Sequence, residues 1–423
     1  MRALVGFGMA AMVGLSACNV GSDWEESDDP DAVEEVSQAI INNVQSYTDT
    51  LGEAGLSTNG KKVVVAGGML HATYEVGGAI LYTSSTDGVT WTAPVTLWSF
   101  GAQSPTIAVD SMGRIGVAYA MPSGNFGGAL NYSYKVPGGS WVHMYNILPN
   151  YVAKTPSMIA DGPDMHLVFT SGSKVYYMQF ATNNPGSPIP EHATEAPPGG
   201  TVGDFLPSIA RSVAPGGGKR SRIALIRQLV TSSTQRMAVH FVERTGAFAF
   251  TDLGLFQTGT GLTGIGTAHS LSMDANPTTG DYFIAASFSV GATARTYLYR
   301  SNSLSAGPIT QFQFSTVGSQ VSMAAATIDC VNQMRLQWSP LAYGSTNYRT
   351  GTWSSGPSPT WIDAAPVQMA ASGLASTSML SSILLAGTNT RRSFRSFHDT
   401  SNGGNSFTLQ IDHVSGPNPQ PCN

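Results

Sequence analysis

Side chains that could act on a substrate are sparse in this chain. After residue 50 the glutamates are Glu53, Glu75, Glu191, Glu195 and Glu243. Hydrolysis of a glycosidic bond needs two carboxyl groups that face each other across the bond, and the spacing of these glutamates pairs none of them. The arginines that could hold an anionic ligand are Arg211, Arg227, Arg295 and Arg349. Nothing in their spacing singles out a group that converges, so we assign no catalytic residue.

Sequence motifs with a known catalytic mechanism are also missing. The chain has no Gly-x-Ser-x-Gly elbow, no His-Glu-x-x-His and no phosphate-binding loop. The eight histidines are scattered singly. We therefore expect His71 and His166, which lie in strand-like stretches, to be core residues and not metal ligands. We expect no metal and no cofactor.

The charge is concentrated near one end. Charged residues make up 11% of the chain, against roughly 25% in an average domain. Eight of the 26 acidic residues lie between Asp23 and Glu35, and without them and Arg2 the body holds 18 acids against 20 bases. A near-neutral body lacks the basic surface of a nucleic-acid binder, so we expect no nucleic-acid partner.

The N-terminus has the composition of an export signal. A positive start, a short apolar run and small residues describe a signal peptide over residues 1–17. The sequence Leu15-Ser16-Ala17-Cys18 resembles the bacterial lipobox, in which the cysteine is lipidated. The resemblance implies a lipoprotein of the cell envelope, bound to membrane only through Cys18. Asn19 favours the outer membrane. The alternative is an ordinary signal peptide with an incidental cysteine.

Two short segments follow the lipobox. Residues 18–31 are acidic and almost free of large apolar side chains, so they are predicted to be a disordered tether. Apolar residues then recur at three- and four-residue steps, which predicts a short helix at about 32–46 within a lead-in of residues 32–54.

A repeat dominates the remaining sequence. Pro105, Pro156 and Pro207 each precede a Ser or Thr and an apolar residue, and they are 51 residues apart. Each repeat holds four short apolar runs separated by Gly, Pro, Ser and Asn, which indicates four strands. A four-stranded sheet cannot bury both faces alone, so such units pack around a ring. We predict an all-β fold, a β-propeller of seven four-stranded blades over residues 55–415, with a C-terminal tail at 416–423. The last two units of the repeat are degenerate, so six or eight blades are alternatives, as is a two-sheet sandwich array.

One turn links this propeller to a known family. Ser85, Asp87, Gly88 and Trp91 resemble the Asp-box hairpin of sialidase-like propellers, although this copy is one residue shorter between Asp and Trp. In that family the box lies on the outer rim and is structural. The family's Tyr/Phe-Arg-Ile-Pro segment is absent here, which puts a sialidase activity in doubt.

The other two cysteines are candidates for a disulfide bond. With Cys18 assigned to lipid, an oxidising compartment favours pairing of Cys330 with Cys422, which would hold the Pro-rich tail. Two unrelated free thiols are the alternative.

Propellers usually bind ligands on the face where the innermost strands begin. The candidate residues at that face are Gln103, Lys154, Asp204, Arg227, His269, Arg295, Trp338 and Tyr343. We expect a surface-anchored module that binds a carbohydrate or a surface protein. The alternatives are a sialidase-like glycoside hydrolase and a structural component of an envelope assembly.

Overall fold

The computed structural model describes the larger part of the chain from residue 40 to residue 415. The described residues are 40–48, 60–76, 78–86, 90–121, 128–186, 188–194, 203–213, 218–231, 234–257, 266–276, 279–290, 293–302, 310–314, 321–328, 333–340, 347–353, 358–362, 367–368, 375–384, 390–399 and 406–415. The signal peptide, Cys18, the tether, Asp87, Gly88, Cys330, Tyr343 and Cys422 lie outside them. The side chains of His269 and Arg295, which lie in strands, are also outside the description.

The described strands form seven antiparallel sheets, which we call blades 1 to 7. Blade 1 holds β2 (Val63–Ala66), β3 (Met69–Val76), β4 (Ala79–Ser85) and β5 (Val95–Trp98). Blade 2 holds β6 (Gln103–Val109), β7 (Ile115–Ala120), β8 (Leu130–Lys135) and β9 (Trp141–Met144). Blade 3 holds β10 (Ala153–Asp161), β11 (Asp164–Ser171), β12 (Lys174–Ala181) and β13 (Glu191–His192). Blade 4 holds β14 (Gly203–Val213), β15 (Lys219–Thr231), β16 (Thr234–Gly246) and β17 (Ala249–Gln257).

The second half of the chain continues the pattern. Blade 5 holds β18 (Gly266–Ala275), β19 (Asp281–Val290), β20 (Thr293–Asn302) and β21 (Thr310–Phe314). Blade 6 holds β22 (Val321–Ile328), β23 (Gln333–Pro340), β24 (Asn347–Thr352), β25 (Thr360–Trp361) and β26 (Val367–Gln368). Blade 7 holds β27 (Ala375–Leu384), β28 (Thr390–Asp399), β29 (Ser406–Ser415) and, from the other end of the chain, β1 (Ile40–Thr48).

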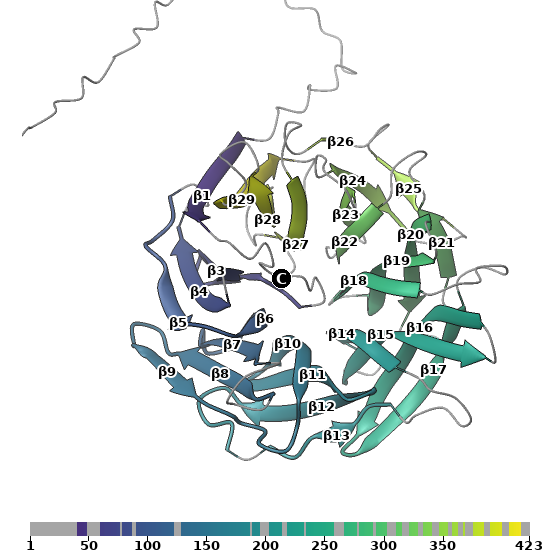
Figure 1. Cartoon of the computed structure of the whole chain (residues 1–423), viewed down its shortest axis with the longest axis horizontal. Helices are drawn as coiled ribbons and strands as arrows, with labels where there is room; N and C mark the ends of the chain where they lie inside the picture. Colours follow the sequence, from purple (N-terminus) through teal and green to yellow (C-terminus); the bar gives the residue numbers. More distant parts are fainter. Residues whose placement is uncertain are drawn as a thin grey trace, which may run out of the picture. The chain divides into compact units, whose positions relative to one another are not determined.

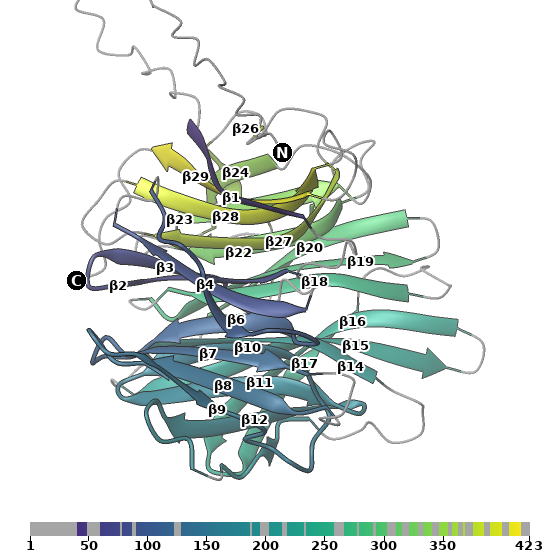
Figure 2. The ribbon, with the colours of Figure 1, turned by 60° about the vertical axis from the view of Figure 1, so that its left-hand side comes forward.

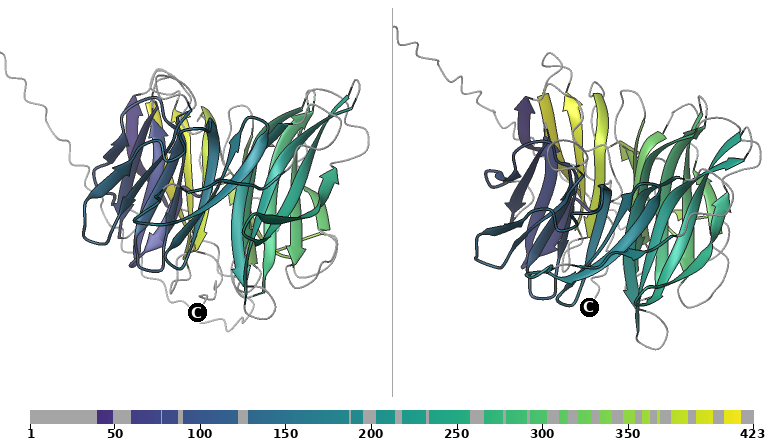
Figure 3. Two further views of the ribbon diagram at one scale, coloured as in Figure 1. Left: turned by 90° about the horizontal axis from the view of Figure 1, so that it is seen from below. Right: turned by 60° about the horizontal axis from the view of Figure 1, so that its bottom comes forward.

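The blades close into a ring within a compact unit that spans Ser37–Asn423. The first strands contact one another in the order β2, β6, β10, β14, β18, β22 and β27, and β27 contacts β2 again. Figure 1 shows these strands arranged around the centre of the ring. In Figures 2 and 3 the sheets stand face to face, with strands running from one end of the ring to the other. The predicted seven-bladed propeller is confirmed.

The predicted helix is wrong over residues 40–46, where the structure has strand β1. The rest of that prediction, residues 32–39, lies outside the described residues. β1 pairs antiparallel with β29, from Ile40 opposite His413 to Thr48 opposite Ser406. Blade 7 has only three strands from its own end of the chain, so β29 needs a partner for its outer backbone groups. This long-range pairing overrides the local helical periodicity.

The Pro-Ser/Thr pairs of the 51-residue repeat lie where the innermost strands of neighbouring blades contact each other. The hydroxyl of Thr106 accepts a hydrogen bond from the backbone N–H of Met158 at 3.2 Å. Ser157 accepts one from Ile209 N–H at 3.4 Å, and the third hydroxyl, Ser208, one from Met273 N–H at 3.1 Å. The Ser or Thr after each proline therefore ties its blade to the next, which explains why the repeat keeps a small hydroxyl residue there.

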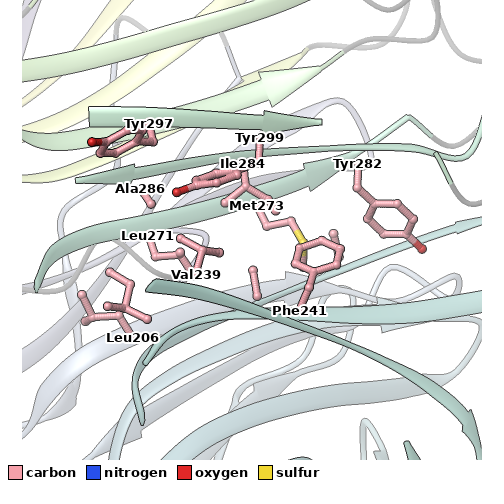
Figure 4. Packing of buried hydrophobic residues seen from close by; sticks show 13 residues of the cluster. Leu206, Val239, Phe241, Leu271, Met273, Tyr282, Ile284, Ala286, Tyr297 and Tyr299 are labelled. Atoms are coloured by element: carbon pink, nitrogen blue, oxygen red, sulfur yellow. The ribbon is translucent and has the colours of Figure 1, made fainter. Parts of the chain in front are cut away.

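Apolar side chains fill the space between neighbouring blades. Figure 4 shows one such cluster between blades 4 and 5, where Phe241 and Val239 from β16 face Leu271, Met273 and Ile284. Each blade thus covers an apolar face that it cannot bury within its own sheet.

Candidate ligand-binding face

The antiparallel order of the strands defines the two ends of the ring. Each innermost strand begins at the end where the fourth strand of the preceding blade finishes, and we call this end the upper face. The loops between first and second strands lie at the opposite end, the lower face. Of the predicted ligand residues, Gln103, Lys154 and Asp204 lie near the starts of β6, β10 and β14, and therefore at the upper face.

The upper face has a depression between blades 2 and 3. Its volume is about 180 Å³, and it is lined by Gln103, Ser104, Ala120, Lys154 and Thr155. Gln103 and Lys154 are exposed, whereas the floor is made of smaller side chains. The sequence predicted two of these five residues.

A backbone irregularity shapes this depression. Ser104 and Thr155 have positive φ values of 55° and 46°, a conformation that is uncommon for residues other than glycine. Each precedes a proline, and the strand register shifts at this point in both blades. Leu206, at the same place in blade 4, has a φ of 49°. The bulges turn the strand starts towards the upper face.

The carboxyl groups described near this depression already have partners. Glu75, at the upper end of β3 and only 4% exposed, accepts a hydrogen bond from the backbone N–H of Ser104 at 3.1 Å. Asp204 accepts two bonds from Arg227, at 2.8 and 2.9 Å, and a third from the Thr194 hydroxyl at 2.7 Å. The Asp204 and Arg227 side chains are almost fully buried. This ion pair therefore stabilises the upper end of blade 4, and both Asp204 carboxylate oxygens are engaged by protein donors.

Trp338 does not lie on the exposed upper face as expected. It is 2% exposed, and its ring packs edge-on against Phe314 at 4.7 Å between centroids. Side chains alternate across a strand, and the residue falls on the side of β23 that faces blade 5. It is a core residue.

The arginines with described side chains do not converge. Arg227 belongs to the upper end of blade 4, whereas Arg211, at the lower end, bonds Asp161 at 2.9 Å. Arg349, in blade 6, lies 4.7 Å above the Trp361 ring. The described part of the chain therefore holds no cluster of three arginines from this set.

Two histidines form buried pairs with tyrosines, as expected for core residues. The Tyr82 hydroxyl lies 2.6 Å from His71 Nδ1, and the Tyr177 hydroxyl lies 2.5 Å from His166 Nδ1. Arg211 Nη1 lies 2.9 Å from His166 Nε2 and 3.3 Å from Nδ1, so the guanidinium is close to both ring nitrogens. Burial, and then Arg211, lower the pKa of His166 to about 3. Burial likewise lowers the pKa of His71.

The Asp-box-like turn lies away from the depression. It connects β4 to β5 at the lower end of blade 1. Of its four residues, buried Ser85 and partly buried Trp91 are described. The backbone N–H of Thr92 donates to Ser84 O at 2.9 Å, which closes the hairpin. A structural role for Asp87 stays a prediction.

Among the described residues, no helix is long and apolar enough to cross a membrane. In the same part of the chain, no three His, Cys, Asp or Glu side chains gather as metal ligands would.

Comparisons with known proteins returned solved structures but no sequence relatives. No family model and no curated protein sequence matches the chain. A GH93 α-L-arabinofuranosidase of Fusarium graminearum in complex with arabinobiose is 12% identical, with a TM-score of 0.48, over 79% of this chain and 98% of that chain. The β-propeller domain of the Trilobed protease from Pyrococcus furiosus is 9% identical, with a TM-score of 0.47, over 86% and 96%. An intramolecular trans-sialidase from Ruminococcus gnavus is 10% identical, with a TM-score of 0.44, over 68% and 94%. The assignment of the propeller fold rests on the strand pairing described above.

Proposed function

We propose that this chain is a carbohydrate-binding propeller held at the cell surface by a lipid on Cys18. The observation that carries the proposal is the depression on the upper face. It presents the Gln103 amide, the Lys154 ammonium and small hydroxyl residues, while Glu75 and Asp204 are occupied by protein donors.

These groups suit the hydroxyls of a sugar. An amide both donates and accepts hydrogen bonds, and an ammonium donates up to three, so together they match groups that also do both. The strand starts are fixed by bulges and by hydroxyl bonds between blades, so little ordering is needed on binding. Among the described residues the site has donors and acceptors but no free carboxyl pair, and this supports binding without hydrolysis.

A glycan array tests the proposal directly. The probe is the protein lacking residues 1–35, with Gln103→Ala and Lys154→Ala as variants. Lys135→Ala, at the lower end of blade 2, is the matched control. We expect the wild type and the control to bind the same glycans. Lys154→Ala should bind at least about tenfold more weakly, which is the loss of one charge-assisted hydrogen bond, and Gln103→Ala about three- to tenfold more weakly, which is the loss of a neutral one.

The same protein is assayed with a panel of 4-methylumbelliferyl glycosides. Absence of turnover together with array binding supports the binding module. Turnover that Glu75→Gln abolishes would replace it with a glycoside hydrolase, and absence of any glycan binding would refute the proposal.

A further inference from the structure

Three aromatic side chains meet on the upper face at the junction of blades 1 and 2. Trp98 ends β5, Phe100 follows two residues later, and Tyr145 follows the last residue of β9. The Trp98 ring lies 5.3 Å from that of Tyr145 and 6.2 Å from that of Phe100, measured between centroids. β5 and β9 are the fourth strands of their blades, so both deliver these residues to the upper face. We call the three the aromatic platform.

Two of the three rings are largely in water. Phe100 is 61% exposed and Tyr145 is 60% exposed. Trp98 is partly buried and lies beside buried Tyr119, at 6.4 Å between centroids, so its position is fixed from below. A contiguous apolar surface of this kind is characteristic of an interaction site.

The loops that carry the platform are held in place. The Trp98 indole N–H donates to Phe100 O at 2.5 Å, and Ala102 N–H donates to Gly78 O at 2.9 Å. Gly78 lies so close to the connection 99–102 that a Cβ on Gly78 would be 2.7 Å from the backbone nitrogen of Gly101. The loop after Tyr145 is tied by Asn146 N–H to the Asn131 side-chain oxygen at 2.8 Å. The rings are therefore preorganised before any partner arrives.

The chemistry around the platform selects a neutral partner. The connections 99–102 and 145–152 contain no charged residue. They add exposed amides at Asn146 and Asn150. The face of an aromatic ring is electronegative, so it attracts the slightly positive C–H groups on the apolar face of a sugar ring. Amides beside it can bond the hydroxyls at that ring's edge.

We propose that the aromatic platform is a stacking subsite for a neutral pyranose of the glycan chain that the depression binds. This proposal rests on the proposed function. Phe100 and Gln103 are three residues apart on one connection, so the platform and the depression are neighbouring parts of the same face. A glycan of several residues then contacts both, whereas a disaccharide contacts one.

The test is calorimetric titration with neutral β-linked gluco-, xylo- and manno-oligosaccharides of two and six residues. The variants are Phe100→Ala and Tyr145→Ala, with Phe248→Ala as control. Phe248 is 66% exposed but lies in the β16–β17 turn at the lower face. Each platform variant should weaken hexasaccharide binding about three- to tenfold, with the control unchanged. The platform variants should also bind the hexasaccharide no more tightly than the disaccharide.

Other results would overturn the subsite. If Lys154→Ala weakens hexasaccharide binding and the platform variants do not, the platform is no subsite while the proposed function stands. If no oligosaccharide binds the wild type although glycans of the array do, the subsite falls and the proposed function stands; if no glycan of the array binds either, both fall. If the wild type is a dimer in light scattering and Tyr145→Ala is a monomer without any change in sugar binding, the platform is an interface between two copies.

Discussion

Buried titratable side chains give the blades a measurable pH dependence. The pKa of His166 is lowered to about 3 in the folded protein by burial and by Arg211, against 6.5 for the free side chain. Between these pH values the unfolded chain binds a proton that the folded protein excludes, so stability falls as the pH drops from about 6.5 towards 3. At pH 5 the loss from this one group is about 2 kcal/mol.

Urea unfolding of His166→Gln at pH 7.5 and pH 5 checks this value. Between pH 7.5 and pH 5, the free energy of unfolding of the variant should fall by about 2 kcal/mol less than that of the wild type. His192→Gln, which replaces an exposed histidine of the same blade, should behave as the wild type. Equal acid sensitivity in all three proteins would contradict the assignment.

Lys62 gives a pH dependence of the same sign on the alkaline side, because its pKa is also lowered in the folded protein. It is fully buried next to β6, its ammonium donates to Pro105 O, and burial lowers its pKa to about 7, with Glu75 opposing the shift. The unfolded chain keeps this proton up to about pH 10.5, so stability should rise with pH above 7. From pH 7 to pH 9 the expected gain is about 2–3 kcal/mol.

Replacement of Lys62 by Met should remove this gain. Lys61→Met is the control, because Lys61 is partly exposed and pairs with Asp274 of blade 5 at 3.1 Å. Thermal unfolding across this pH range measures both variants, and a gain retained in Lys62→Met would show that another group titrates.

At the scale of the element, the hydroxyl bonds between innermost strands are the feature that the repeat encodes. Thr106 is fully buried and bonds the next blade. Thr106→Val keeps the shape but leaves the Met158 N–H without its acceptor, which should cost about 1–3 kcal/mol. Thr106→Ser keeps the hydroxyl and should cost less. Chemical denaturation compares the two, and equal losses would mean that methyl packing is what matters at this position.

Elements with a local signature could be predicted from the sequence, and those made by distant pairing could not. The prolines at 105, 156 and 207 mark the starts of the innermost strands, so the blades could be predicted from the spacing of these prolines. Strand β1 was missed because its partner lies at the other end of the chain, and local periodicity contains no information about it. Gln103 and Lys154 could be placed at the strand starts from their position before those prolines, whereas their role in ligand binding stays a prediction. Trp338 was misplaced because an aromatic residue near a loop has the same signature whether it faces a ligand or a neighbouring blade.

At the scale of the whole molecule, β1 closes the ring by joining the two ends of the chain in blade 7. A protein that starts at residue 49 exposes the edge of β29, whereas one that starts at residue 37 keeps the closing strand. We expect the shorter protein to unfold at lower temperature and to aggregate through the open edge. Differential scanning calorimetry and size-exclusion chromatography distinguish the two, and equal behaviour would show that closure by β1 contributes little.

The N-terminal segment would determine how far the propeller lies from the membrane. From Cys18 to Ile40 a fully extended chain reaches at most about 75 Å, so a lipid on Cys18 would keep the propeller within that distance of its membrane. We predict that the wild type partitions into the detergent phase of a Triton X-114 extract and that Cys18→Ser moves to the aqueous phase. Asn19→Asp keeps the lipidated cysteine and should stay in the detergent phase, while shifting from the outer to the inner membrane in an enteric host. A wild type found in the aqueous phase would remove the anchor and leave a freely secreted propeller.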